Sequence, residues 1–218
     1  MAKRFELIVF DWDGTLMDSA AAIVASIQAA ARDLGLAPPS EDRARHVIGL
    51  GLGEALRHAL PELAEARHEE LADRYRHHYL AQDHELALFE GAAGLVQALG
   101  EAGHLLAIAT GKSRKGLDRA LGQSGLGALF QATRCADECH SKPHPQMLEE
   151  LMDEFGVSPA TTLMIGDTTH DLLMAKNAGT GAVGVAYGAH PPAVLAAEAP
   201  LHLAMNIEDL RRWLDANG

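Results

Sequence analysis

Short apolar runs alternate with amphipathic helical segments over most of the chain. Leu7 to Phe10 is a continuous run of strand-forming residues, and comparable runs recur as far as residue 204. The expected strands are 7–10, 105–109, 131–134, 162–165, 182–186 and 201–204, with helical patterns such as 94–102, 115–122, 145–155 and 207–216 between them. This alternation predicts an α/β fold, here a doubly wound parallel sheet of the Rossmann-like kind.

The stretch from about residue 18 to residue 81 departs from this alternation, because its pattern is helical throughout. Ile23, Ile27 and Leu34 recur at helical spacing. The expected helices are 18–34, one that starts at Ser40, 54–60 and 62–80. We therefore expect an inserted helical cap domain over residues 17–85, and an α/β core domain formed by residues 1–16 and 86–218.

Composition restricts the classes of partner that this chain can bind. It has 218 residues, is 48% hydrophobic and carries a formal net charge of −12. This acidity argues against nucleic acid and against an anionic membrane surface as partners, because both require a basic face. Glu6 and Asp11 interrupt the first apolar run, which is then too short for a signal peptide or a membrane span. A cytoplasmic globular protein is the expectation.

Charged and hydroxyl side chains cluster at the predicted carboxyl ends of the strands, the edge of a parallel sheet where ligands bind. They are Asp11, Asp13, Thr110, Lys142, Asp167 and Asp171. A hydroxyl beside the N–H groups of a strand-to-helix turn, as at Thr110, can bind an anion. Carboxylates crowded in one crevice need a compensating cation. Ligands of this oxygen-only kind select Mg²⁺, which leaves room for a substrate phosphate.

A second candidate site is the segment from residue 135 to residue 144, which contains Cys135, Cys139, His140 and His144. Cysteine and histidine side chains can bind zinc. However, zinc sites of this type usually bring two ligand pairs together from separate parts of a small fold. We therefore expect the cluster to be structural, although the sequence does not assign it a role.

Four ordered motifs resemble those of the haloacid dehalogenase superfamily. They are Asp11-x-Asp13-Gly14-Thr15, Thr110-Gly111, Lys142-Pro143 and Gly166-Asp167-x-x-x-Asp171. The resemblance spans nearly the whole chain, including a helical insert just after the first motif. Within the superfamily the chain is most similar to phosphoglycolate phosphatase-like enzymes. True dehalogenases lack the second acid of the first motif, so Asp13 favours phosphoryl chemistry.

The resemblance implies how the residues would act on a phosphate ester. Asp11 is the expected nucleophile, which forms an aspartyl-phosphate, and Asp13 is the expected acid and then base. Thr110 and Gly111 are expected to hold the transferring phosphoryl oxygens, and Lys142 to offset the charge of Asp11 and the phosphate.

The resemblance also implies a ligand set for Mg²⁺. The expected ligands are Asp11, the main-chain carbonyl of Asp13, and Asp167. Asp171 is expected at the edge of the metal site or just beyond its ligands.

The helical insert is expected to select the leaving group, chiefly through the loop 49–54, with Gly51 and Glu54 as candidate residues. The resemblance makes phosphoglycolate the best guess. The alternatives are a sugar-phosphate phosphatase or a mutase of the β-phosphoglucomutase type, which shares all four motifs. From another class, a non-catalytic binding protein could use the same fold.

Overall fold

A parallel sheet forms the centre of the molecule. The computed structural model describes residues 4–218. Within that range the sheet has six strands in the order β3-β2-β1-β4-β5-β6. Their bounds are β1 Leu7–Phe10, β2 Leu105–Thr110, β3 Ala132–Cys135, β4 Thr162–Gly166, β5 Gly181–Val185 and β6 His202–Ala204. All adjacent pairs are parallel, so the predicted doubly wound α/β fold is confirmed.

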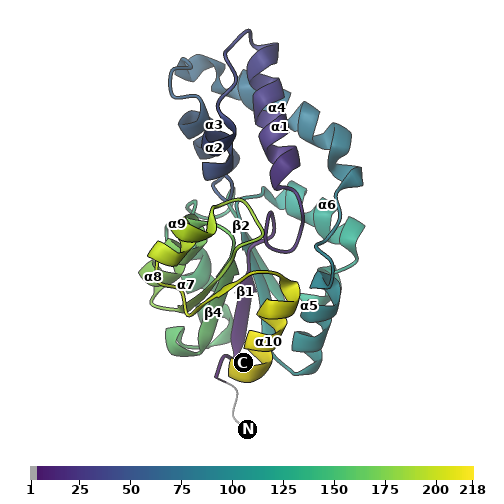
Figure 1. Cartoon of the computed structure of the whole chain (residues 1–218), viewed down its shortest axis with the longest axis vertical. Coiled ribbons are helices and arrows are strands. Elements are labelled where there is room, and N and C mark those ends of the chain that lie inside the picture. The colour runs from purple at the N-terminus through teal and green to yellow at the C-terminus, as the bar shows by residue number, and fades with distance from the viewer. Residues whose placement is uncertain (1–3) are drawn as a thin grey trace.

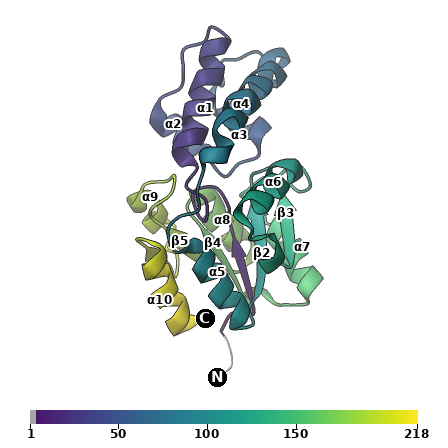
Figure 2. The same ribbon diagram turned by 90° about the vertical axis from the view of Figure 1, so that its right-hand side faces the viewer.

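Both faces of the sheet are buried, which explains why the central strand is apolar throughout. In β1, Ile8 and Phe10 face one hydrophobic cluster, whereas Leu7 and Val9 face another, as the two-residue period of a strand requires. The first cluster is covered by α5 (Ala92–Glu101), α6 (Arg114–Ser124) and α10 (Ile207–Asn217), and the second by α7 (Gln146–Phe155) and α8 (Thr169–Ala178). Figure 2 shows α5 and α10 together on the side of the sheet that faces the viewer.

The helical insert lies beyond the carboxyl ends of the strands (Figure 1). It consists of α1 (Ala20–Asp33), α2 (Glu41–His46), α3 (Leu52–Ala59) and α4 (His68–Gln82). These helices pack around a hydrophobic cluster of their own, which includes Ile27, Leu56 and Leu71. Short 3₁₀ turns at 65–67, 83–85, 127–129 and 159–161 and helix α9 (Pro192–Ala197) complete the chain. Among the described residues, no helix combines the length and the apolar character needed to cross a membrane.

Helix starts were the weakest part of the sequence prediction. The helix expected over 62–80 begins only at His68, because Leu63 packs into the insert cluster from a turn and a 3₁₀ turn follows it. Helix α8 starts at Thr169, within the last acidic motif. Thr168 caps this helix, and the side chain of Asp171 at its third position accepts a hydrogen bond from the Thr168 N–H.

Candidate active site

The carboxyl ends of β1, β2 and β4 lie side by side and bring the first and last acidic motifs together. Phe10 pairs with Ile108 on one side and with Ile165 on the other. Asp11 directly follows Phe10, Asp167 lies two residues after Ile165, and both acids are completely buried. The register of the sheet therefore places the two carboxylates at one point.

The turn after β1 is shaped by its contact with the Asp167 carboxylate. Gly14 has a φ of +82°, and a Cβ at this position would overlap the Asp167 side chain. Only glycine satisfies both conditions without strain. Thr15 Oγ1 then donates a hydrogen bond of 3.0 Å to Asp167 Oδ1, and the Ala189 N–H donates one of 2.7 Å to Oδ2. The Gly-Thr part of the motif thus positions Asp167.

Lys142 reaches the same point from the loop after β3. Its Nζ lies 2.7 Å from Asp11 Oδ1 and 2.6 Å from Asp171 Oδ1, with all three side chains buried. Burial alone would lower the pKa of Lys142, but the charges of Asp11 and Asp171 raise it above its ordinary value. The lysine is therefore a charged bridge between the two acids. Asp171 is held from its other side by Thr168, whose N–H and Oγ1 both donate to Oδ2.

The acidic group fits a divalent cation with oxygen ligands. Oxygen atoms of Asp11, Asp167 and Asp171 lie within 4.8 Å of one another. Asp11 Oδ2 is buried and, among the described residues, has no hydrogen-bond partner. Burial raises the pKa of Asp11 to about 7 against the opposing attraction of Lys142. Burial and the charges of Asp11 and Asp171 also raise the pKa of Asp167 well above its usual range. A cation here would relieve both penalties.

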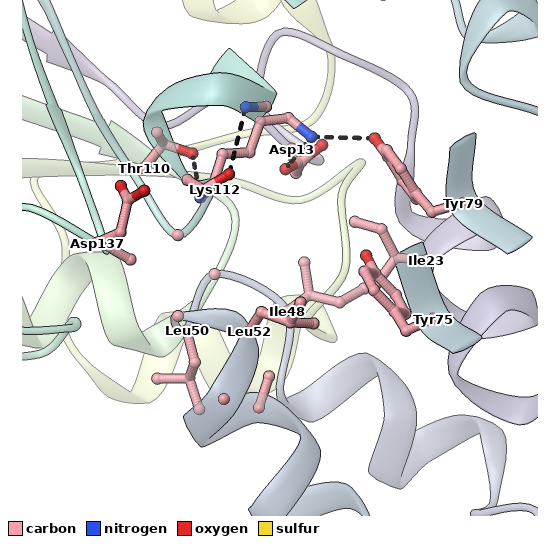
Figure 3. A pocket seen from close by; sticks show the side chains of 18 of the residues that line it. Asp13, Ile23, Ile48, Leu50, Leu52, Tyr75, Tyr79, Thr110, Lys112 and Asp137 are labelled. Atoms are coloured by element: carbon pink, nitrogen blue, oxygen red, sulfur yellow. Dashed lines mark hydrogen bonds and ion pairs between the residues drawn. The ribbon is translucent and has the colours of Figure 1, made fainter. Parts of the chain in front are cut away.

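The side chain of Asp13 has its own partners, outside this acidic group. Ser19 Oγ donates a hydrogen bond of 2.7 Å to its Oδ1, and Lys112 Nζ lies 3.0 Å from its Oδ2. Lys112 also donates a hydrogen bond of 3.0 Å to the Tyr79 hydroxyl, which belongs to α4 of the insert (Figure 3). The sequence analysis did not assign Lys112, Ser19 or Tyr79. Lys112 directly follows Thr110-Gly111 and could have been found from its place at the strand end, whereas Tyr79 has no such signal.

Thr110 and Gly111 lie where the insert meets the end of β2. Thr110 is fully buried, and its Oγ1 accepts a hydrogen bond of 3.2 Å from the Lys112 N–H. A Cβ on Gly111 would overlap the carbonyl oxygens of Gly49 and Leu50. The absence of a side chain at Gly111 is therefore what lets the insert loop approach the strand end so closely.

A cavity of about 590 Å³ opens between the insert and the sheet edge. Asp11, Asp13, Thr110 and Lys112 form its sheet side. The insert contributes the opposite walls, which include Ile23, Ile48, Leu50, Leu52 and Tyr75 (Figure 3). The predicted selectivity residues Gly51 and Glu54 also line the cavity, and the Gly51 N–H donates a hydrogen bond of 2.9 Å to Ser141 Oγ of the core. The arrangement thus encloses an organic group next to a nucleophilic carboxylate.

A group of histidines that the sequence did not reveal also joins the insert to the core. His170 Nε2 and His190 Nε2 lie 2.8 and 3.1 Å from the main-chain oxygen of His46, which ends α2. The His46 and His190 rings stack with centroids 5.2 Å apart. Burial lowers the pKa of the His170 and His190 rings, that of His190 to about 4. At neutral pH the His190 ring is therefore neutral, with Nδ1 accepting from the Thr169 N–H and Nε2 donating to the His46 carbonyl.

The cysteine and histidine cluster does not converge as a metal site. Cys135 is buried at the end of β3, and burial raises the pKa of its thiol to about 12. Cys139 Sγ lies 3.7 Å from Glu150 Oε2, while the His140 and His144 rings contact each other. Within residues 4–218 the only His, Cys, Asp or Glu group with metal-site spacing is the acidic one described above.

Comparisons with known proteins agree with this geometry. A family model described as haloacid dehalogenase-like hydrolase matches residues 8–185. The chain is 40% identical over 202 residues to a probable phosphatase, IndB, of Dickeya dadantii. The aligned region covers 89% of this chain and 86% of that protein. It is 31% identical to a phosphoglycolate phosphatase of Vibrio vulnificus over 95% of each. The crystal structure of a predicted phosphoglycolate phosphatase from Haemophilus somnus matches with a TM-score of 0.85 and 27% identity, over 98% of this chain and 99% of that one. The chain therefore belongs to the haloacid dehalogenase-like hydrolases and is a phosphatase of that family.

Proposed function

We propose that the protein is a Mg²⁺-dependent phosphatase of small phosphate monoesters and that it works through an aspartyl-phosphate on Asp11. The environment of the Asp11 carboxylate supports this proposal. Asp11 is a buried carboxylate with one oxygen held by Lys142 and the other without a hydrogen-bond partner among the described residues, at the floor of a cavity that also contains Asp13. A buried carboxylate oriented in this way is pre-organised as a nucleophile.

In the first step, an oxygen of Asp11 attacks phosphorus while the bond from phosphorus to the leaving oxygen breaks. The departing alkoxide takes a proton from Asp13, which enters this step as the acid. Lys142 compensates negative charge beside Asp11, and Thr110 with the Gly111 N–H binds phosphoryl oxygens. The buried ion pair of Lys142 with Asp11 and the place of Thr110 at the cavity support these roles.

In the second step, water attacks the phosphorus of the aspartyl-phosphate and Asp13 accepts its proton. The bond from phosphorus to Asp11 then breaks, which releases inorganic phosphate and restores the carboxylate. Ser19 and Lys112 hold the two oxygens of Asp13, and this supports a fixed orientation of Asp13 through both steps.

The proposed metal ligands are Asp11, Asp167 and the main-chain carbonyl of Asp13. The chemistry that Mg²⁺ supplies in such a site is electrostatic stabilisation of the phosphoryl oxygens. We place Asp171 beyond the ligands, because the Lys142 ammonium pairs with its Oδ1 and both the N–H and Oγ1 of Thr168 donate to its Oδ2. Asp167, by contrast, accepts a single neutral hydrogen bond at each oxygen. Asp171 then orients the lysine that faces the nucleophile.

We further propose that residues 17–85 act as a cap domain over a core formed by residues 1–16 and 86–218. The separate hydrophobic cluster of the insert and its position over the strand ends support this division. A cap of this kind can exclude water during phosphoryl transfer and select the leaving group. Phosphoglycolate is the reference ester to assay first, because the relative from Vibrio vulnificus is named for it.

The deciding experiment measures phosphate release from a panel of esters with Mg²⁺, together with isomerisation of sugar phosphates. Asp11→Asn should reduce release by roughly a thousandfold or more, as for other residues that act as the nucleophile. Asp215→Asn on the exposed face of α10 is the matched control and should be unaffected. Asp13→Asn should still react with p-nitrophenyl phosphate, whose leaving group needs no proton, and acid-quenched protein should then carry one phosphoryl group on Asp11.

The same panel separates the alternatives. Isomerisation of a sugar phosphate without release would identify a mutase. Binding of esters with neither release nor isomerisation would identify a non-catalytic module. Activity of Asp11→Asn above a few per cent of the unmodified protein would show that the covalent route is wrong.

A further inference from the structure

We infer that the ester this site is built for has a bulky, largely apolar alcohol that carries a planar ring, rather than the small anionic glycolate. The inference rests on the proposed phosphatase function and concerns the leaving group alone. It follows from three features of the cavity between the insert and the sheet: its size, the charges on its insert side, and the two tyrosines on α4.

The size of the cavity exceeds what glycolate requires. At about 590 Å³ it lies within the range of sites that enclose a whole organic ligand. Its insert walls include the hydrocarbon side chains of Leu52 and Leu80, which are partly exposed, beside those of Ile23, Ile27, Ile48 and Leu50, which are nearly buried. Phosphoglycolate has only a carboxymethyl group beyond its phosphate, so it would leave these walls against water. An apolar alcohol would remove its own surface and the exposed surface of these side chains from water, which is favourable in proportion to the area buried.

The charges on the insert side disfavour a carboxylate there. Glu54 brings a negative charge to the cavity lining. Arg76, the cation among the described insert residues that line the cavity, is already paired with Glu69 at 3.0 Å and with Asp73 at 2.7 Å. A glycolate carboxylate would therefore meet the like charge of Glu54, while the Arg76 guanidinium is already shared between two carboxylates.

The cations on the core side of the cavity also fail to provide a close partner for a carboxylate. Arg119 pairs at 3.1 Å with Asp83, and Lys112 is held between Asp13 and Tyr79. Lys115 is exposed at the cavity lining, where solvent weakens its attraction for an anion. A neutral leaving group avoids the cost of an incompletely paired charge.

The two tyrosines supply a surface for a planar ring. The Tyr75 and Tyr79 rings stack with centroids 5.8 Å apart and planes 20° from parallel. Lys112 holds Tyr79 in place. Its ammonium lies 4.8 Å from the centroid of the Tyr79 ring and also donates a hydrogen bond to the Tyr79 hydroxyl. Tyr75 borders the cavity in Figure 3, and within the described part of the chain its hydroxyl makes no hydrogen bond. An aromatic leaving group can pack against this pair at a favourable offset, and a polar substituent can use the Tyr75 hydroxyl.

The test compares esters whose alcohols have similar acidity but different bulk: benzyl, cyclohexylmethyl and ethyl phosphate, with phosphoglycolate beside them. Benzyl phosphate should have a kcat/KM about tenfold or more above those of ethyl phosphate and phosphoglycolate, mainly through a lower KM. It should also exceed cyclohexylmethyl phosphate. A kcat/KM for phosphoglycolate equal to or above that for benzyl phosphate would overturn the inference. A higher kcat/KM for the cyclohexylmethyl ester than for the benzyl ester would show that the pocket does not favour a planar ring.

Variants of α4 then connect the preference to this wall. Tyr75→Ala should reduce the ratio of benzyl to ethyl kcat/KM by about tenfold. Leu80 also lines the cavity but is 44% exposed, so Leu80→Asn tests the same wall with little risk to folding and should lower the ratio severalfold. His77→Ala, an exposed position of the same helix outside the cavity lining, is the matched control and should leave the ratio unchanged. Equal losses for both esters in Tyr75→Ala and Leu80→Asn would overturn the assignment.

A binding experiment keeps this inference separate from the proposed function. Calorimetry with Asp11→Asn and Mg²⁺ should find benzyl phosphate bound at least tenfold more tightly than ethyl phosphate or phosphoglycolate, with a more negative heat-capacity change that marks apolar burial. If no ester in the panel releases phosphate from the unmodified protein, the proposed function fails, while this binding order still decides the nature of the pocket. Equal affinities would overturn the inference even if the protein is an active phosphatase.

Discussion

The ammonium group of Lys112 lies 3.0 Å from Oδ2 of Asp13, and both side chains are nearly buried. Lys112 comes from the core strand end that also carries Thr110, yet its ammonium simultaneously binds the Tyr79 hydroxyl of the insert. The orientation of the proposed acid and base therefore depends on a residue that the insert holds in place. This is a physical route by which the position of the insert can affect proton transfer.

Lys112 should act as a positioning residue for Asp13. Lys112→Met should lower kcat/KM for alkyl phosphates by roughly tenfold to a hundredfold, since a misplaced acid protonates the alkoxide poorly. The loss should be much smaller for p-nitrophenyl phosphate, whose leaving group needs no proton. Lys176→Met, which removes an exposed charge from α8, is the control. Equal losses for both ester types would contradict a role through Asp13.

Asp11 should contribute a loss of stability to the metal-free protein as pH rises between about 4 and 7. Burial raises the pKa of Asp11 from the ordinary 3.8 to about 7, so in this window the folded chain holds a proton at Asp11 that the unfolded chain has lost. The free energy of unfolding then falls with rising pH. His190 contributes with the opposite sign, because its pKa is lowered to about 4.

The difference between two proteins isolates the Asp11 contribution to this pH dependence. Urea unfolding of the unmodified chain and of Asp11→Asn, both in excess chelator, should show that the variant gains stability relative to the unmodified chain from pH 5 to pH 7. The contribution of His190 is common to both proteins and cancels in the subtraction. A constant difference across this range would mean that Asp11 is not strained by burial in the metal-free fold.

Removal of the metal should abolish activity without unfolding the chain. Mg²⁺ at a hundred times its Kd stabilises by about 2.7 kcal/mol, which for a chain of this size raises Tm by about 5 to 10 °C. Asp167→Asn should reduce this increase and weaken the apparent affinity for Mg²⁺. Ca²⁺ should raise Tm but inhibit, because its larger and looser coordination misplaces the nucleophile. Full activity in excess chelator would remove the metal from the mechanism.

Residues 49–54 should influence which esters are preferred. The loop expected over these residues ends at Gly51, which caps α3, so Glu54 lies in the first turn of that helix. Glu54→Gln removes a negative charge from the cavity and should raise the kcat/KM of phosphoglycolate severalfold relative to ethyl phosphate. Gly51→Ala should also change the ranking, since its Cβ would lie 3.1 Å from Ala136 Cβ at the contact with the core. Glu62→Gln, an exposed insert position outside the cavity lining, serves as the control. Uniform losses with an unchanged ranking would show that the loop is only a structural cover.

The cysteines should be dispensable for the reaction. A double variant, Cys135→Ala with Cys139→Ser, should keep activity within about threefold and should contain no zinc, because the cluster has no convergent ligand geometry. Alanine is used at Cys135 because a buried hydroxyl without a partner would be destabilising. Stoichiometric zinc in the purified unmodified protein would contradict this prediction.

The sequence alone was sufficient for the sheet and for the positions of the acids along it. Leu7 to Phe10 is apolar on both faces because both faces are buried, and such a run is recognisable without any partner. A strand that ends in Asp11 or Asp167 also places its carboxylate at a known edge of a parallel sheet. These features follow from the local order of residues, since strand period, turns and strand ends are properties of neighbouring positions.

Tertiary structure decided which side chains these acids contact and what fills the space before them. Lys142 joins Asp11 to Asp171, and Lys112 joins Asp13 to Tyr79, across separations that no periodicity encodes. The apolar cavity likewise depends on which side chains of α3 and α4, such as Leu52 and Leu80, remain partly exposed when the insert packs on its own cluster. A hydrophobic stripe on a helix looks the same in sequence whether it faces a core or a ligand, and only packing separates the two cases.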